Sequence, residues 1–231
     1  LLGARGNSGV ILSQFFKGVS TELARCAFAG PGELRNALIR GYRTAYDAVV
    51  KPVEGTMLTV AREGIEHIRG QITRNSSIEE ILAMYIAEMK KTLSYTPEML
   101  DVLKEAGVVD SGGAGLVCFV DGICAHLRGE APEDIGEQIA LSTAPAGADF
   151  GPDSRLEYGY CTEFILQLMN YKTDLAAFDL QRFTKPLEEL GDSIVVVCSD
   201  SIVKVHIHSF TPEKVLEYGR KFGEFLTLKI E

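Results

Sequence analysis

The spacing of apolar residues changes once along this chain, and that change sets the fold class. From Val10 to about Leu127 the apolar residues recur three and four positions apart, which is the spacing of one face of an α-helix. After about residue 156 short segments alternate apolar and polar residues, as half-buried β-strands do. We therefore predict a multidomain protein, in which an all-α domain is followed by a small α+β domain.

The first domain is predicted over residues 1–130 as a helical bundle. Glycine and proline residues, together with polar residues suited to cap a helix, separate its apolar stretches. Helices joined by short turns of this kind usually pack as a bundle around one apolar core. The expected helices cover residues 10–26, 31–50, 56–72, 77–93, 97–106 and 116–127.

The second domain is predicted over residues 157–231, after a linker over residues 131–156 that is rich in Gly, Pro, Ala, Asp and Ser. Its strand and helix patterns follow the order βαββαβ, which is typical of a ferredoxin-like fold. In this fold an antiparallel sheet carries two helices on one face. The expected strands cover residues 158–168, 193–198, 202–208 and 225–230, and the expected helices cover residues 175–190 and 212–222.

The composition narrows the class of protein. With 231 residues, of which 46% are hydrophobic, the chain can bury a sizeable core. The formal net charge of -9, without a cluster of Lys and Arg, argues against a nucleic-acid partner, because phosphate backbones bind basic surfaces. No apolar run approaches the roughly 20 residues of a transmembrane helix. The cysteines are scattered and odd in number, which favours reduced thiols in the cytoplasm over a disulfide framework.

The chain opens on a glycine-spaced polar loop that leads into the first expected helix. Gly6 and Gly9 allow positive φ angles and close approach of the backbone, and Ser8 is a suitable N-cap. Free N–H groups and the positive dipole end make a helix start an anion site. This loop, with Asn7, is a candidate phosphate site; a turn that only begins a helix is the alternative. Because Leu1 already lies in this loop, we expect the sequence to be a fragment without its N-terminal portion.

Two further segments combine polar residues with a helix start. Thr56 and Met57 follow a turn and offer a hydroxyl for a cap or a phosphate and a flexible thioether for a base. The alternative for Met57 is a core residue. Asp110, Ser111 and Gly112 place a cap and glycines before the last expected helix. Three such segments on one bundle indicate helix N-termini that converge on an anion.

A second candidate site lies on the predicted sheet. Alternation along residues 202–208 places His206 and His208 on one face, and alternation along the first strand leaves Cys161 on its polar face. Since the first and third strands of a ferredoxin-like sheet are antiparallel neighbours, these three side chains are expected to cluster. One thiolate and two imidazoles can bind Zn²⁺ with a fourth position open. The alternative is a solvated face with an unrelated cysteine nearby, because no CxxC element accompanies the histidines.

Five segments together resemble the bacterial fatty acid kinase A subunit, which belongs to the dihydroxyacetone-kinase-like superfamily. They are residues 2–14, 51–58, 107–113, 158–163 and 203–208. The resemblance covers nearly the whole chain. It implies a helical ATP-binding domain like the dihydroxyacetone kinase L subunit, followed by the middle domain of the family. It further implies a kinase that phosphorylates the carboxylate of a fatty acid, held by a separate lipid-binding protein, to give an acyl phosphate for membrane phospholipid synthesis.

Carried over by position, the resemblance assigns roles to individual residues. It implies nucleotide binding by Gly6, Asn7, Ser8, Gly9, Thr56, Met57, Asp110, Ser111 and Gly112. Ser111 departs from the family pattern, since the corresponding loop reads Asp-Pro-Gly in the dihydroxyacetone kinases. In the second domain the resemblance implies that Cys161, His206 and His208 hold a zinc ion and are needed for catalysis of phosphotransfer.

The resemblance also implies Mg²⁺ ions, held by an aspartate-rich segment that precedes the first loop and is absent from this sequence. Phosphoryl transfer depends on such ions, so we expect this fragment to bind nucleotide weakly and to be nearly inactive alone. The C-terminal domain that is expected to engage the lipid-binding protein is absent too. Two other functions stay open: a kinase of a small polyol such as dihydroxyacetone, and a non-enzymatic scaffold that senses nucleotide. A homodimer and a monomer are both compatible with the sequence.

Overall fold

The computed structural model describes residues 4, 6–24, 26–130 and 159–231, so the expected linker, residues 131–156, lies outside the described residues. The first part is helical, as the sequence predicts. The first two helices end at Leu23 and Asp47, a few residues before the predicted positions. The helices are α1 (Gly6–Leu23), α2 (Pro31–Asp47), α3 (Met57–Ile68), α4 (Ile78–Met99), α5 (Asp101–Ala106) and α6 (Ser111–Leu127).

The helix α4 contains Pro97 in its last turn, whereas the sequence predicts that a new helix begins there. Proline has no N–H to donate to the carbonyl of Leu93, four residues earlier. The hydroxyl of Thr96 donates to that carbonyl instead, at 2.8 Å, and the helix continues to Met99. The prediction of a helix from Pro97 is therefore wrong, and α5 begins at Asp101.

The last helix of this part, α6, begins at Ser111 and not at the predicted Leu116. The carboxylate of Asp110 accepts a hydrogen bond from the Gly113 N–H at 2.6 Å, which caps the helix. Gly113 also packs closely, because a β-carbon there would lie 3.0 Å from Val60. The cap and this contact outweigh the low helix propensity of glycine, so the glycine-rich segment forms the first turns of α6.

An apolar core joins the helices of the first part. Its fully buried members include Tyr85, Ile65 and Met89. The helices α1 and α2 lie in close contact at Gly18, where a β-carbon would lie 2.8 Å from the Cα of Gly41. None of the described helices is both long and apolar enough to cross a membrane.

The second part is a small α/β domain whose elements follow the predicted order. Its four strands form one antiparallel sheet in the order β2-β3-β1-β4. The helix expected over residues 175–190 is a short α-helix that continues as a 3-10 helix, since Pro186 cannot donate to the carbonyl of Arg182. The elements are β1 (Tyr160–Leu168), α7 (Leu180–Thr184), η1 (Lys185–Glu189), β2 (Asp192–Ser199), β3 (Ile202–Ser209), α8 (Pro212–Arg220) and β4 (Gly223–Ile230).

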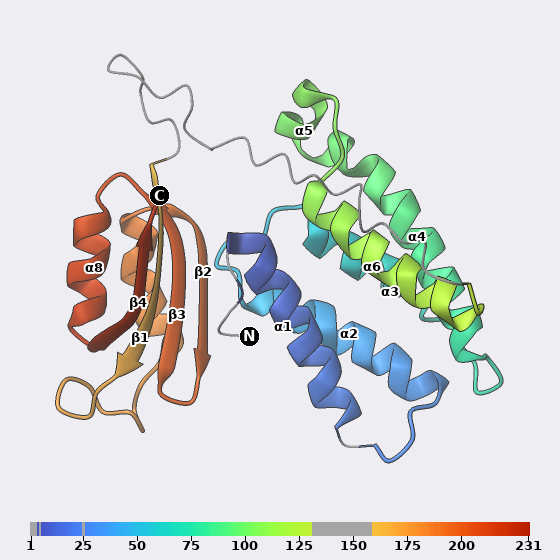
Figure 1. Cartoon of the computed structure of the whole chain (residues 1–231), viewed down its shortest axis with the longest axis horizontal. Helices are drawn as coiled ribbons and strands as arrows, with labels where there is room; N and C mark the ends of the chain where they lie inside the picture. Colours follow the sequence, from blue (N-terminus) through green and yellow to red (C-terminus); the bar gives the residue numbers. More distant parts are fainter. Residues whose placement is uncertain (1–3, 5, 25, 131–158) are drawn as a thin grey trace.

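The two faces of the sheet have different neighbours (Figure 1). One face packs against the helices of its own domain, where Phe164 and Val205 share a core with Val215 of α8. On the other face Val195 of β2 packs against Val10 and Ala48 of the helical domain. The N–H of Val50, just after α2, also donates to the carbonyl of Ile194 at 3.2 Å. The helical domain therefore docks on the face of the sheet that carries the predicted polar cluster.

Candidate functional site

Three helices of the first domain begin around one cavity. Its volume is about 180 Å³, and its lining includes Asn7 and Ser8 of α1, Thr56 and Met57 at the start of α3, and Asp110 before α6. The N–H groups in the first turn of a helix have no partner inside that helix, and each helix start is a positive dipole end. The three segments that the sequence singles out therefore meet at one place, and that place suits an anion.

Gly112 lies where these three segments touch. A β-carbon on Gly112 would stand 3.2 Å from the methyl carbon of Met57 and 3.3 Å from both the Asp110 carboxylate and the Ser8 hydroxyl. Glycine keeps the segments in close contact, because any side chain would push one of them away. Gly112 itself does not line the cavity, and neither do three other residues to which the resemblance assigns nucleotide binding: Gly6, Gly9 and Ser111.

The start of α1 differs from the prediction. The helix begins at Gly6, whose φ is +64°, so Ser8 lies inside the first turn and the prediction that it is the N-cap is wrong. The side-chain oxygen of Asn7 is buried and has no hydrogen-bond partner among the described residues. An unsatisfied buried polar group is costly, and this oxygen accepts, so it suits a donor group of a ligand. The amide nitrogen of the same side chain is the group that can donate to an anion in the cavity.

Thr56 precedes α3 but does not cap it with its side chain. Its hydroxyl donates to the carbonyl of Val53 at 2.8 Å and makes no capping hydrogen bond with α3. The first-turn N–H groups of α3 are therefore not bonded to the Thr56 side chain. Met57 belongs to the helical core, which is the alternative that the sequence left open for it, and it also lines the cavity. A contact of its thioether with a base stays a prediction.

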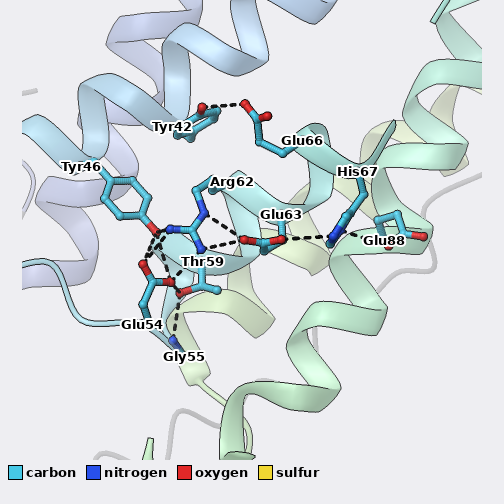
Figure 2. A network of polar contacts seen from close by, with 10 residues as sticks. All are labelled: Tyr42, Tyr46, Glu54, Gly55, Thr59, Arg62, Glu63, Glu66, His67 and Glu88. Carbon is cyan, nitrogen blue, oxygen red and sulfur yellow. Dashed lines mark hydrogen bonds and ion pairs between the residues drawn. The ribbon is translucent and has the colours of Figure 1, made fainter. Parts of the chain in front are cut away.

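A network of hydrogen bonds fixes the turn that leads into α3 (Figure 2). The Glu54 carboxylate accepts from the Arg62 guanidinium at 2.7 and 3.0 Å and from the Thr59 hydroxyl at 2.7 Å. The Thr59 hydroxyl oxygen in turn accepts from the Gly55 N–H at 2.9 Å. Burial acts to raise the pKa of Glu54, but the hydrogen bonds from Arg62 and Thr59 outweigh it and lower the pKa. An ionised Glu54 therefore holds the turn that carries Thr56.

The strands β1 and β3 bring Cys161, His206 and His208 together. In their antiparallel register Cys161 lies opposite His208, and Glu163 lies opposite His206. One ligand atom from each of the two histidines and the cysteine lies within 4.8 Å of the others. The Cys161 Sγ is 3.9 Å from the His206 Nδ1. The structure thus gathers all three predicted ligands on the face of the sheet that the helical domain covers.

Glu163 joins this cluster, although the sequence places it on the same face without giving it a role. Its Oε1 accepts hydrogen bonds from the His206 Nδ1 at 2.8 Å and from the Gly6 N–H at 2.6 Å. Burial acts to raise the pKa of Glu163, but these two hydrogen bonds outweigh it and lower the pKa. Burial also lowers the pKa of His206. Since a carboxylate only accepts, a neutral His206 donates from Nδ1 and carries a lone pair on Nε2.

The donor set of this cluster fits a metal ion. The His206 Nε2 is buried and has no hydrogen-bond partner among the described residues. Two imidazoles and a thiolate are the ligands of a Zn²⁺ site with one open position, and a carboxylate behind one histidine is their usual support. Burial raises the pKa of the Cys161 thiol, and the charge of Glu163 raises it further. A bound cation favours the thiolate and opposes both effects.

Comparison with known protein families matches residues 1–125 to the DAK2 domain and residues 157–231 to the FakA-like middle domain, which is named after fatty acid kinase. The chain belongs to the DAK2 domain family. It is 40% identical over 235 residues to an uncharacterized protein of Staphylococcus haemolyticus and 38% identical over 237 residues to protein YloV of Bacillus subtilis. Both comparisons cover 100% of this chain and 42% of the relative, so the chain spans less than half the length of these relatives.

The cavity of the DAK2 domain has further lining residues that sequence reasoning missed. Lys51, which is exposed, is one of them, and its position directly before Pro52, in a segment already singled out, was an available signal. Ser193 and Val195 come from β2 of the middle domain. Ser193 has a φ of 52°, which is unusual for a residue other than glycine. No local pattern distinguishes it, because its place depends on how the two domains dock.

Proposed function

We propose that this protein is an ATP-dependent phosphotransferase that transfers the γ-phosphate of ATP to the carboxylate of a fatty acid. The joint presence of a DAK2 domain and a FakA-like middle domain supports kinase chemistry. The cavity where three helix starts of one domain meet the sheet of the other is the observation that carries the proposal. In this proposal a separate lipid-binding protein presents the fatty acid, as the resemblance implies.

The phosphates of ATP are proposed to lie at the helix starts. There Asn7 and Ser8 offer hydrogen-bond donors, and Lys51 offers a positive charge. Met57 is proposed to lie against the adenine, because a thioether packs readily on a flat ring. The cavity of about 180 Å³ is smaller than the roughly 300–1,000 Å³ of common ligand pockets. A whole nucleotide therefore extends beyond it or widens it.

A zinc ion is proposed at Cys161, His206 and His208, where the buried and unpartnered Nε2 of His206 supports the fit. When bound, such an ion supplies a positive charge that stabilises negative charge developing on the transferred group. The residues of the chain keep this site ordered, since Glu163 fixes the orientation of the His206 ring.

The chemistry needs little proton transfer. The carboxylate of a fatty acid is already ionised at neutral pH, so it can attack the γ-phosphorus in line without a general base. The bond between the γ-phosphorus and its bridging oxygen breaks, and ADP leaves with the electron pair. Catalysis then comes mainly from positioning and from neutralising charge. Asn7, Ser8 and Lys51 are proposed to orient the phosphates, while Ser193 and Val195 of the middle domain close one side of the cavity and limit access of water.

Magnesium accompanies ATP in this kind of reaction, but the described residues of the cavity offer few ligands for Mg²⁺. Asp110 is the one carboxylate that lines the cavity among the described residues, and it already accepts from the Gly113 N–H. A protein-bound Mg²⁺ commonly takes one or two carboxylates besides the phosphates. These residues do not form a magnesium site.

We also propose a ferredoxin-like fold for the middle domain, on its βαββαβ order and the strand order β2-β3-β1-β4. A cytoplasmic location is proposed because all five cysteines are free thiols, as in a reducing compartment. The acidic composition supports the proposal that nucleic acid is not a partner.

Nucleotide binding is tested first, by calorimetric titration of the complete protein with ATP. The Asn7→Ala variant is expected to bind ATP about tenfold or more weakly, because it loses a hydrogen bond to a charged phosphate. The zinc proposal is tested by mass spectrometry of the purified protein. About one zinc per chain is expected, and its loss is expected in a Cys161→Ala/His206→Ala variant. Absence of ATP binding by the wild type would contradict the proposed function.

Phosphotransfer is tested with ATP and a fatty acid bound to its carrier protein, with hydroxylamine added to trap an acyl phosphate as a hydroxamate. Formation of the hydroxamate supports the proposal. If ATP binds and dihydroxyacetone is phosphorylated instead, the protein is a polyol kinase. If ATP binds and neither acceptor is phosphorylated, the result favours a scaffold that senses nucleotide.

A further inference from the structure

We propose that Glu163 couples the metal site of the middle domain to the nucleotide-binding end of α1. Occupation of the site at Cys161, His206 and His208 then orders the first turn of α1. This inference rests on the proposed function, because it takes the Cys–His cluster as a metal site. Glu163 acts as a positioning residue, since it is assigned contact with neither the substrate nor the metal.

The geometry joins two domains through one oxygen atom. The Oε1 of Glu163 accepts from the His206 Nδ1 in its own domain and from the Gly6 N–H in the helical domain. The Glu163 side chain is 11% exposed, so water competes little for these hydrogen bonds. Gly6 is the first residue of α1, and the cavity-lining Asn7 and Ser8 follow it directly.

The carboxylate of Glu163 serves as an anion at the N-terminus of α1. A negative charge at this end of a helix stabilises the helix through its dipole and its free N–H groups. Such a group usually comes from a residue next to the helix in sequence, whereas Glu163 lies 157 positions after Gly6. The first turn of α1 therefore depends on how firmly the middle domain holds Glu163.

A metal ion bound to His206 would restrict the position of the Glu163 carboxylate further. When Nε2 binds a metal, the ring keeps its proton on Nδ1 and its orientation is fixed, so the hydrogen bond to Glu163 is fixed as well. The coupling is reciprocal: any ligand that orders the first turn of α1 also strengthens metal binding. Other described contacts between the domains are the apolar packing of Val195 on Val10 and Ala48 and the backbone hydrogen bond from Val50 to Ile194, and these do not include a member of the cluster.

Hydrogen–deuterium exchange of the complete protein tests this coupling without a need for catalysis or nucleotide. Exchange is measured for residues 6–12, with zinc bound and after removal of zinc by a chelator. In the wild type, zinc is expected to slow exchange about fivefold or more, the lower end of ordinary coupling between two sites. In Glu163→Ala this dependence on zinc is expected to vanish, while Glu163→Gln, which can still accept both hydrogen bonds, keeps part of it.

The matched control is Glu224→Ala, which removes a carboxylate of the same domain that bonds to Lys172 and Tyr171, away from the cluster. This variant is expected to respond to zinc as the wild type does. Exchange of core amides in β1 and β3 reports whether each variant is folded. A direct titration with zinc is expected to show 10–100-fold weaker binding by Glu163→Ala, as for other residues that support a metal ligand.

The outcomes separate this coupling from the proposed function. If the wild type binds zinc but residues 6–12 exchange equally with and without it, the coupling is wrong and the metal site stands. If a folded Glu163→Ala protein still shows the full response to zinc, Glu163 is not the link. If the wild type binds no zinc, the metal site and the coupling fail together, while binding of ATP in the separate titration is unaffected.

Discussion

The carboxylate of Glu54 and the guanidinium of Arg62 form two hydrogen bonds, at 2.7 and 3.0 Å, beside the turn that carries Thr56 into the cavity. Because the pKa of Glu54 is lowered in the folded protein, its charge stabilises the fold above the ordinary carboxyl pKa. This stabilisation is lost as the pH falls through the lowered pKa. The turn should therefore loosen in acid before the apolar core does.

Replacement of Glu54 by Gln tests this relationship. At pH 7 the free energy of unfolding of Glu54→Gln is expected to fall by about 1 kcal/mol, the upper end for a partly exposed ion pair. Well below the lowered pKa of Glu54 the wild type and the variant should have the same stability, because both side chains are then neutral. Urea unfolding followed by circular dichroism at both pH values measures the difference. Glu98→Gln, which breaks an exposed pair with Lys104, should change little at either pH.

Gly112→Ala is expected to weaken ATP binding by about tenfold or more, because the new methyl group would lie 3.2–3.3 Å from three segments that line the cavity. Calorimetric titration with ATP measures the loss. The control is Gly115→Ala in the same helix, where a β-carbon has open space. That variant should bind ATP normally and be slightly more stable, because alanine favours helix over glycine. Equal ATP affinities of the two variants would contradict the role given to Gly112.

Lys51→Met is expected to weaken ATP binding by about five- to tenfold, or ~1–1.4 kcal/mol, and to leave the affinity for adenosine unchanged. The charge of Lys51 acts on phosphates, which adenosine lacks. The effect on ATP should shrink at high salt, since a charge at the edge of the cavity is screened. Lys90→Met on α4, which removes an exposed ion pair with Asp121 of α6, is the control and should alter neither affinity. A loss of adenosine binding would instead indicate that Lys51 supports the shape of the cavity.

Ser193→Gly is expected to raise the free energy of unfolding by up to about 1 kcal/mol, because a non-glycine residue at a φ of 52° is strained. The same change removes a hydroxyl from the cavity and is expected to weaken ATP binding. Asp200→Gly relieves similar strain at a φ of 55° in the turn between β2 and β3, away from the cavity. Thermal unfolding and ATP titration of both variants should show a gain of stability in each and a loss of affinity in Ser193→Gly alone. If neither variant lost affinity, the Ser193 hydroxyl would have no part in binding.

Much of this architecture follows from patterns that are local in the sequence. The helical and alternating periods predict the two kinds of domain, and the β1–β3 pairing places Cys161 next to His208 without further assumptions. Errors arise where a single side chain changes a local preference. The hydroxyl of Thr96 lets α4 continue through Pro97, and the carboxylate of Asp110 starts α6 in a glycine-rich segment.

The residues that the sequence could not reveal depend on contacts between distant segments. Glu163 shares a face with Cys161 by simple alternation, but its hydrogen bond to Gly6 requires the two domains to dock. Ser193 reaches the cavity for the same reason. Periodicity describes each domain by itself and carries no information about the surface on which another domain rests.

One extra residue in β2 determines which side of that strand each later residue occupies. Asp192 pairs with His208 and Val195 pairs with His206, so Ser193 and Ile194 together stand opposite Ile207. Ile194, the second residue of this bulge, lies in the core of the middle domain, and Val195, which follows the bulge, lies against the helical domain. Loss of one residue from this stretch would move the side chains that now face the core of the middle domain to the face toward the helical domain, and the reverse. The number of residues in this short stretch, and not only their chemical nature, therefore determines which of the two surfaces each side chain joins.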